Sequence, residues 1–190
     1  MKILKMVVLI FGMLVSCHHG TSQQIFLTFG GDISKSNGSG HFDWESLAYG
    51  GSLGLEFHDG YKLSATATAS FLETPKNTAT DLFGKKFAHK VTTRVYMAGV
   101  KFMALPRKNS EGGMFLLAQI GATTEKVKQY DNEYHWLSDR AEIGLALGPG
   151  IGYRYKYVQA SVRYLMVLTF GRASHADFQL AYLLPLRKLK

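Results

Sequence analysis

Apolar and polar residues alternate with a period of two along most of the chain. In residues 47–57 one set of alternate positions is apolar, whereas the other set holds small residues, serine and Glu56. Residues 61–71 repeat this pattern, with serine, threonine and Lys62 at the polar positions. Because successive side chains of a β-strand point to opposite faces, the alternation predicts strands with one apolar face and one polar face.

The same alternation recurs through the chain, and no segment shows a helical period. We predict eight strands, at residues 24–33, 47–57, 61–71, 90–104, 114–127, 141–154, 158–170 and 176–186. Their connections differ in length, with long ones at residues 34–46, 74–89 and 128–138 and tight turns at residues 58–60 and 154–157. Long connections on one side and short turns on the other are typical of an up-and-down barrel.

Strands of this length and alternation are typical of a transmembrane β-barrel, whose apolar face meets lipid while its polar face lines the interior. Within lipid every backbone N–H and C=O must be paired, and a closed barrel achieves this because it has no free edge. Aromatic residues near both ends of the apolar faces fit the two girdles of such a barrel. The sequence therefore predicts an all-β fold, an eight-stranded antiparallel transmembrane up-and-down β-barrel. A soluble β-sandwich or a lipocalin-like barrel is the alternative.

The start of the chain has the pattern of a secretory signal peptide. Two lysines precede a short apolar stretch, and small and polar residues follow it. Two cleavage sites fit this pattern. Residues 14–17 resemble a bacterial lipobox, which would make Cys17 a lipidated N-terminus, whereas residues 20–22 satisfy the small-residue rule of ordinary signal peptidase. Both interpretations export the chain, and we expect residues 1–22 to be the signal peptide and residues 23–190 to form the barrel.

The composition excludes several classes of protein. Aromatic residues make up 13% of the chain and charged residues 19%, unlike an intrinsically disordered protein. The longest apolar run, residues 6–17, is too short for a spanning helix, and one cysteine excludes an internal disulfide. The formal net charge is +8, yet no basic helical stripe, zinc-ligand spacing or RNA-stacking motif indicates nucleic acid. Basic residues near an anionic lipid surface are the simpler interpretation.

The pattern resembles a known family over residues 24–188. The resemblance depends on the alternation, on residues 148–155, and on the aromatic residues Phe178 and Tyr182 of the last predicted strand. These features are similar to those of small eight-stranded outer-membrane barrels of Gram-negative bacteria, the type of the OmpA membrane domain and OmpX. The resemblance implies a barrel in the outer membrane, and it implies no particular activity.

The interior of an eight-stranded barrel is just wide enough for side chains, so an open pore is not expected. We predict that Glu56 and Lys62 face each other across the turn at residues 58–60. The charged residues predicted to point inward are Asp32, Glu56, Lys62, Lys101, Glu125, Arg140, Glu142, Arg154, Arg163, His175 and Asp177. Because buried charges are costly unless paired, we interpret this set as a salt-bridge network. The alternative is a cation site or a proton-linked gate beneath the loops; otherwise no cofactor or metal is expected.

Catalytic residue patterns are sparse. Some small outer-membrane barrels modify lipid A or phospholipid, which requires a nucleophile beside a base. Ser174, His175 and Asp177 lie together near the predicted loop side and are weak catalytic candidates. Adjacent strand residues point to opposite faces, so Ser174 and His175 should not share a proton. An enzyme is therefore the less favoured interpretation.

The predicted long loops combine aromatic residues with lysines, which suits a surface partner or the phosphates of lipopolysaccharide. Solvated loops with aromatic side chains anchored on the rim are the alternative. The loop-binding candidates are Trp44, Lys85, Lys86, Lys90, Tyr134 and Trp136. We therefore expect a monomeric outer-membrane protein with a structural or surface-binding role, in contact with lipopolysaccharide and with a protein partner through its loops. A lipid A or phospholipid-modifying enzyme and a component of a secretion or conjugation apparatus are the alternatives.

Overall fold

The computed structural model describes residues 23–37, 47–58, 62–74, 77–80, 86–106, 112–130, 136–168 and 174–189. Nine strands lie in these ranges: β1 (Gln23–Asn37), β2 (Leu47–His58), β3 (Leu63–Glu73), β4 (Asn77–Thr80), β5 (Lys86–Pro106), β6 (Gly112–Tyr130), β7 (Trp136–Tyr155), β8 (Val158–Val167) and β9 (Ser174–Leu189). Within the described part of the chain, no helix is long and apolar enough to cross a membrane.

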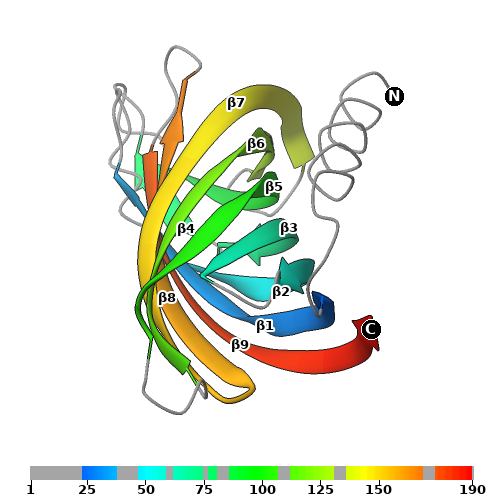
Figure 1. Ribbon diagram of the computed structural model, residues 1–190. Helices are drawn as coiled ribbons and strands as arrows, with labels where there is room; N and C mark the ends of the chain where they lie inside the picture. The colour runs from blue at the N-terminus through cyan, green and yellow to red at the C-terminus, as the bar shows by residue number, and fades with distance from the viewer. Residues whose placement is uncertain are drawn as a thin grey trace.

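Eight of these strands close into an antiparallel barrel (Figure 1). Each barrel strand pairs with the next one along the chain, β9 returns to pair with β1, and β3 pairs with β5. The short strand β4 stands apart from the barrel, because it pairs with β5 beyond the residues that β3 occupies. The predicted all-β, eight-stranded, up-and-down antiparallel barrel is confirmed. The end that holds Gln23, Leu189 and the β7–β8 turn is called the turn end, and the opposite end is called the loop end.

Four strands extend at least three residues further at the loop end than the sequence pattern predicts. β1 runs to Asn37 and β6 to Tyr130, and β5 begins at Lys86 and β7 at Trp136. The long connections predicted at residues 34–46, 74–89 and 128–138 are therefore partly strand, with Lys128 opposite Asp139. The prediction missed these extensions because both faces of a strand are polar once it leaves an apolar environment. The period-two signal then disappears while the backbone hydrogen bonds continue.

The β2–β3 turn is longer than predicted. β2 ends at His58 and β3 begins at Leu63, so the connection between them spans residues 59–62 rather than residues 58–60. Lys62 lies outside the strands and is exposed, so the predicted pairing of Glu56 with Lys62 is wrong. Periodicity fixes which face a residue occupies, but it does not fix the number of residues in a turn. By contrast, the predicted tight turn near residues 154–157 is a two-residue hairpin turn, with Lys156 at a φ of 52°.

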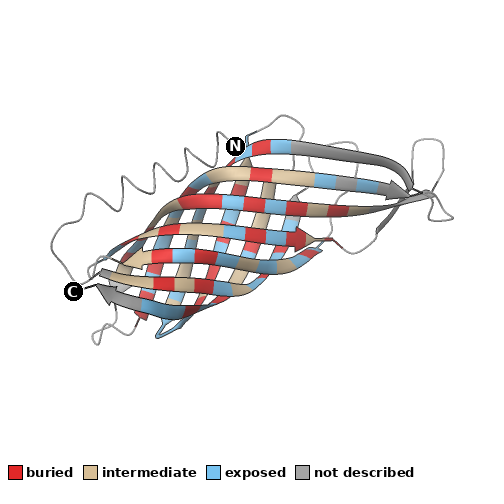
Figure 2. Cartoon of the chain, turned by 90° about the vertical axis from the view of Figure 1, so that its right-hand side faces the viewer, coloured by how far each residue is buried: buried red, intermediate tan, exposed pale blue. Residues whose placement is uncertain are grey.

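The two faces of the barrel wall differ in the way the alternation predicts (Figure 2). Outward positions carry exposed apolar side chains, among them Leu53, Ile120, Leu145, Val162 and Leu180. Buried inward positions include many polar or charged side chains, among them Thr28, Asp32, Glu56, Lys101, Gln119, Arg163 and Asp177. An apolar cluster of Ala48, Leu72, Val95, Met97, Ala146 and Leu165 is also buried. A soluble barrel differs in both respects, because its core is mainly apolar and its surface mainly polar.

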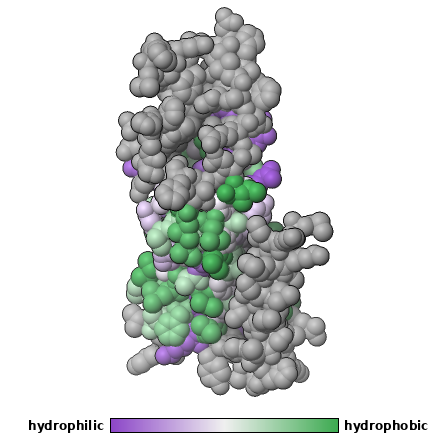
Figure 3. Space-filling view, turned by 90° about the horizontal axis from the view of Figure 1, so that it is seen from above, coloured by the Kyte–Doolittle hydropathy of each residue, from purple (hydrophilic) through white to green (hydrophobic). Residues whose placement is uncertain are grey.

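The apolar outward positions form a belt of limited height. On β6 they run from Met114 to Ala122, nine residues, and the next outward positions are Thr124, Lys126 and Lys128. On β3 they run from Leu63 to Phe71, again nine residues, and Glu73 follows. In the space-filling view, apolar side chains gather into one patch on the wall (Figure 3). The belt ends where charged outward residues begin.

Candidate functional site

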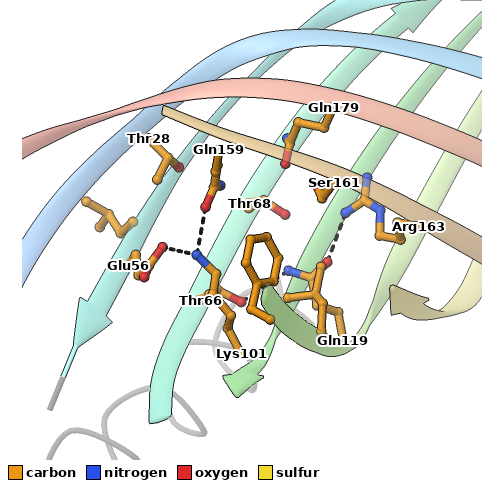
Figure 4. A pocket seen from close by; sticks show the side chains of 13 residues that line it. Thr28, Glu56, Thr66, Thr68, Lys101, Gln119, Gln159, Ser161, Arg163 and Gln179 are labelled. Atoms are coloured by element: carbon orange, nitrogen blue, oxygen red, sulfur yellow. Dashed lines mark hydrogen bonds and ion pairs between the residues drawn. The ribbon is translucent and has the colours of Figure 1, made fainter. Parts of the chain in front are cut away.

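The barrel interior contains a small cavity of about 20 Å³ (Figure 4). Ten of its thirteen lining residues are polar or charged, among them Thr28, Thr66, Gln119, Ser161 and Gln179. A cavity needs roughly 10–15 Å³ on this measure to hold one water molecule. The cavity therefore accommodates water but no larger solute.

Small residues on the inward face leave room for the larger side chains. A Cβ atom at Gly152 would lie 2.3 Å from Cζ of Phe115, and one at Gly148 would lie 3.1 Å from Cδ of Arg163. Phe115 and Arg163 thus occupy the space that side chains at these two glycines would take. The interior is packed by side chains, as expected for eight strands.

An ion cluster lies inside the barrel toward the turn end. Glu56 on β2 contacts Nζ of Lys101 on β5 through Oε2, and its Oε1 lies 3.2 Å from Nη1 of Arg154 on β7. Lys101 Nζ also donates a hydrogen bond of 2.8 Å to Oε1 of Gln159 on β8. Glu56 is 1% exposed, so its carboxylate contacts two cations in place of water. We call these four residues the Glu56 cluster.

Aromatic rings complete the surroundings of both cations. Nζ of Lys101 lies 4.7 Å from the centre of the Phe115 ring, and Cζ of Arg154 lies 4.7 Å from the centre of the Phe26 ring. Cations over ring faces gain electrostatic stabilisation, most of all where water is excluded. The cations are therefore held by the carboxylate on one side and by rings on the other.

A second network crosses the middle of the interior. Arg163 on β8 donates hydrogen bonds of 2.9 Å to Oδ2 of Asp177 and to Oε1 of Gln119. Gln119 on β6 in turn donates to Oγ1 of Thr66 on β3 at 3.1 Å. This chain of side chains connects opposite parts of the wall through hydrogen bonds that no strand pairing provides.

Asp32 on β1 forms a third group. Ser52 Oγ donates to Oδ1 of Asp32 at 3.0 Å, and Nε2 of Gln179 donates to Ser52 Oγ at 2.7 Å. Apart from Glu125 and His175 nearer the loop end, the described interior holds three carboxylates, those of Asp32, Glu56 and Asp177, and three cations, those of Lys101, Arg154 and Arg163. Their formal charges balance.

Other residues of the predicted network lie nearer the loop end. Nε2 of His175 is 3.6 Å from Oε1 of Glu125, and both side chains are partly exposed. Arg140 and Glu142 lie on β7, with Glu142 opposite Glu125, but their side chains are outside the described residues. Among the described residues, no three His, Cys, Asp or Glu side chains are grouped closely enough to hold a metal ion.

The three weak catalytic candidates are not brought together. Ser174 and His175 are adjacent on β9, while Asp177 is paired with Arg163 and His175 with Glu125. Ser174 shares the outward register of Ala176 and Phe178, whereas His175 shares the inward register of Asp177. The structure thus separates the hydroxyl from the imidazole, as the alternation predicts.

The loop-binding candidates lie only partly within the described chain. Trp44, Lys85 and Tyr134, together with the lipidation candidate Cys17, lie outside the described residues. Lys86 and Trp136 begin β5 and β7 rather than lying in loops, and nothing is described of their side chains. Lys90 also belongs to β5, and its Nζ lies 2.5 Å from Oε1 of Glu73 on β3.

The prediction did not identify a second group of cations, on the outside of the barrel. Lys90 and Arg94 on β5 and Lys126 and Lys128 on β6 occupy outward positions just beyond the apolar belt. We call these four residues the outer-wall cluster. The apolar–polar alternation ends near Ala122, but counting every second residue onward from Ala122 places Thr124, Lys126 and Lys128 on the outward face.

Comparisons with known proteins show the fold. No protein-family model matches the sequence, and a search of curated proteins finds no match. Among solved structures, Ail, the attachment invasion locus protein of Yersinia pestis, matches with a TM-score of 0.59 at 15% identity, over 87% of this chain and 100% of Ail. Ail in complex with the heparin analogue sucrose octasulfate matches with a TM-score of 0.57 at 16% identity, with the same coverage.

Neisserial surface protein A gives a TM-score of 0.49 at 11% identity, over 84% of this chain and 96% of that protein. The similarity to Ail shows that the chain has the fold of the small eight-stranded outer-membrane β-barrels.

Proposed function

We propose that this protein is an outer-membrane β-barrel with a structural and surface-binding role, and that it conducts no solutes. The observation that supports the proposal most strongly is the reversed polarity of the wall, with apolar residues outside and paired charges inside. A surface of exposed leucine, isoleucine, valine and aromatic residues is costly in water. Lipid removes this cost.

The height of the apolar belt supports a membrane location. A tilted transmembrane strand needs roughly 9–11 residues to cross the hydrocarbon core. The outward positions are apolar over nine residues on β6, 114–122, and over nine on β3, 63–71. The belt therefore matches the thickness of one bilayer, with polar residues beginning at its boundary.

The packed interior argues against transport. The cavity of about 20 Å³ has room for water, and the networks of Glu56 and Arg163 cross the space through which a solute would pass. Opening a path would separate buried ion pairs, which costs about 3–5 kcal/mol when a partner is lost. A barrel with a closed interior can still bind partners at its surface, and we assign surface binding to this one.

Surface binding is assigned to the loop end. There β5, β6 and β7 run beyond the apolar belt and would project from the membrane. We propose that this end faces outside the cell, after export directed by residues 1–22, and that Trp44, Lys85, Lys86, Lys90, Tyr134 and Trp136 contribute to binding. The barrel is proposed to act as a monomer in contact with lipopolysaccharide, with a protein partner at the loops. The complex of Ail with sucrose octasulfate shows that a barrel of this fold can bind a polyanion.

The proposal is tested by reconstitution. The chain from residue 23 onward is refolded into phospholipid vesicles, and its migration on a detergent gel is compared with and without heating. A folded membrane barrel migrates faster before heating, and it should give no ion conductance in a planar bilayer. A soluble protein that stays outside the vesicles would contradict the membrane location, whereas steady conductance would contradict the closed interior.

A further inference from the structure

The cavity inside the barrel is lined by polar groups that the fold leaves unused. Gln159, Ser161 and Thr28 line the cavity and are 7%, 5% and 7% exposed. Within the described chain, Nε2 of Gln159 and the hydroxyls of Ser161 and Thr28 form no hydrogen bond. The hydroxyl of Thr68, which also lines the cavity, has no partner there either. Buried polar groups without partners are costly, so these four groups favour a ligand in the cavity.

Two amide groups of the lining are oriented by cations (Figure 4). Lys101 donates a hydrogen bond of 2.8 Å to Oε1 of Gln159, and Arg163 donates one of 2.9 Å to Oε1 of Gln119. Lysine and arginine only donate, so each must face the oxygen of the amide rather than its nitrogen. Nε2 of Gln119 gives one hydrogen to Thr66 and keeps one, whereas Nε2 of Gln159 keeps both. The two amides thus offer N–H donors while their oxygens are occupied.

The lining of the cavity carries a positive formal charge. It includes two cations, Lys101 and Arg163, and one carboxylate, that of Glu56, which gives an excess of one positive charge. The ion-pair partners just behind the lining, Arg154 and Asp177, add one charge of each sign. The excess of one positive charge therefore remains when these partners are included.

The formal charges of the interior balance only because of a carboxylate elsewhere. Asp32 does not line the cavity, and its Oδ1 accepts a hydrogen bond from Ser52. Within the described chain, no cation forms an ion pair with Asp32. The positive charge beside the cavity is therefore not compensated by a direct contact with the third acid.

The cavity is close in size to a monatomic anion. Its volume of about 20 Å³ exceeds the roughly 10–15 Å³ that one water molecule needs. A chloride ion is wider than water by a few tenths of an ångström in radius. Gln119, Gln159 and Arg163 have long side chains, so a shift of this size disturbs no strand pairing. Polyatomic anions such as sulfate or phosphate are too large for this space.

We propose that this cavity is a binding site for a single chloride ion, held by Nε2 of Gln159, Nε2 of Gln119 and the hydroxyl of Ser161. Hydrogen bonds to an ionised acceptor are stronger than those between neutral groups, and the ion would offset the positive charge of the lining. The ion would connect the Glu56 cluster with the network of Arg163. This site lies inside the barrel and does not depend on surface binding by the loops.

The test measures urea unfolding of the barrel in lipid vesicles at increasing concentrations of sodium chloride, with sodium gluconate holding the ionic strength constant. Gln159→Glu replaces the unused NH2 group by a carboxylate oxygen, which repels an anion, while the other oxygen still faces Lys101. Gln24→Glu is the matched control, because it makes the same change on β1 at a half-buried position outside the cavity lining. Heat-dependent gel migration first shows that each variant is folded.

We expect the equilibrium constant of unfolding to fall about tenfold for each tenfold rise in chloride above saturation, because one ion binds only the folded protein. Gln24→Glu should keep this dependence. In Gln159→Glu the constant should change by less than about twofold over the same range. Ser161→Ala removes one donor without adding charge, so it should need about tenfold more chloride for the same effect.

Two results would overturn the inference. An unaltered protein whose unfolding does not depend on chloride would have a cavity that holds water only. An equal dependence in Gln159→Glu would place any bound ion elsewhere. If Gln159→Glu does not fold, an unchanged dependence in Ser161→Ala would overturn the inference instead. None of these results bears on the proposed outer-membrane location, because insertion into vesicles is measured separately.

Discussion

The Glu56 cluster and the outer-wall cluster are built from the same kinds of side chain in opposite surroundings. Inside the barrel, one carboxylate is shared by Lys101 and Arg154, and Asp177 pairs with Arg163. On the outside, Lys90 and Lys128 face each other in the strand register. Buried charges must be paired within the fold, whereas exposed charges can remain in excess and attract a partner. The inner cluster is therefore expected to determine stability, and the outer cluster to determine binding.

The largest effect should follow from Glu56→Gln. This change leaves Lys101 and Arg154 buried without their carboxylate, so the free energy of unfolding should fall by about 3–5 kcal/mol. Urea titration of the barrel in lipid vesicles measures it. Glu125→Gln is the matched control, because Glu125 is partly exposed and contacts His175 at 3.6 Å. Equal effects of the two changes would mean that burial of the pair does not determine stability.

The next effect tests the apolar belt between the two clusters. Val162 on β8 is 50% exposed and lies opposite Ile151, well within the belt. Arginine at this position would face hydrocarbon, and Val162→Arg should lower the free energy of unfolding in vesicles by about 2–4 kcal/mol. Leu168→Arg, at the loop end of the same wall, should cost about 0–1 kcal/mol. A silent Val162→Arg would mean that this face does not contact lipid.

A smaller effect is expected in the network across the middle of the barrel. Gln119→Leu removes the acceptor of one Arg163 hydrogen bond and the donor to Thr66. Loss of a partner for a buried polar group should cost about 1–3 kcal/mol in urea unfolding. Thr124→Val, on the outward face of the same strand, should change stability by less than about 0.5 kcal/mol. Equal values would show that the chain from Arg163 to Thr66 does not contribute.

The smallest effect on stability should come from the outer-wall cluster. Lys126→Gln/Lys128→Gln should change the free energy of unfolding by less than about 0.5 kcal/mol in vesicles without anionic lipid. Any change should be toward greater stability, because the repulsion between Lys90 and Lys128 is relieved. A loss comparable with that of Glu56→Gln would show that the lysines serve the fold and would remove the contrast between the clusters.

The sequence predicted the strands and their faces, because every second side chain of a strand lies on the same face and suits the environment of that face. Leu53 and Val162 are exposed and Glu56 and Arg163 are buried, as the alternation predicts. The partner of Glu56 was not predictable in this way. Lys101 lies 45 positions further along the chain, and β3 separates their strands in the sheet. Their contact depends on how the closed barrel brings inward side chains together.

The other errors have local causes. The connection between β2 and β3 spans residues 59–62, and alternation on either side is compatible with turns of several lengths. The extensions of β1, β5, β6 and β7 were missed because polar residues on both faces give no period. The outer-wall cluster was missed because the lysines of β6 were assigned to the end of a strand without following its outward face to Lys128.

The central claim is that β6 crosses a bilayer between residues 114 and 122, with its even-numbered side chains in lipid. Spin labels placed one at a time from Phe115 to Lys128, on the barrel in vesicles, test it through collision with dissolved oxygen, which concentrates in hydrocarbon, and with a water-soluble nickel complex. The collision rate with oxygen should alternate with a period of two and be highest at positions 118 and 120. At positions 126 and 128, the collision rate with the nickel complex should be the higher of the two. An aqueous reagent that reached Ala118 and Ile120 freely, or collision without alternation, would contradict the membrane barrel.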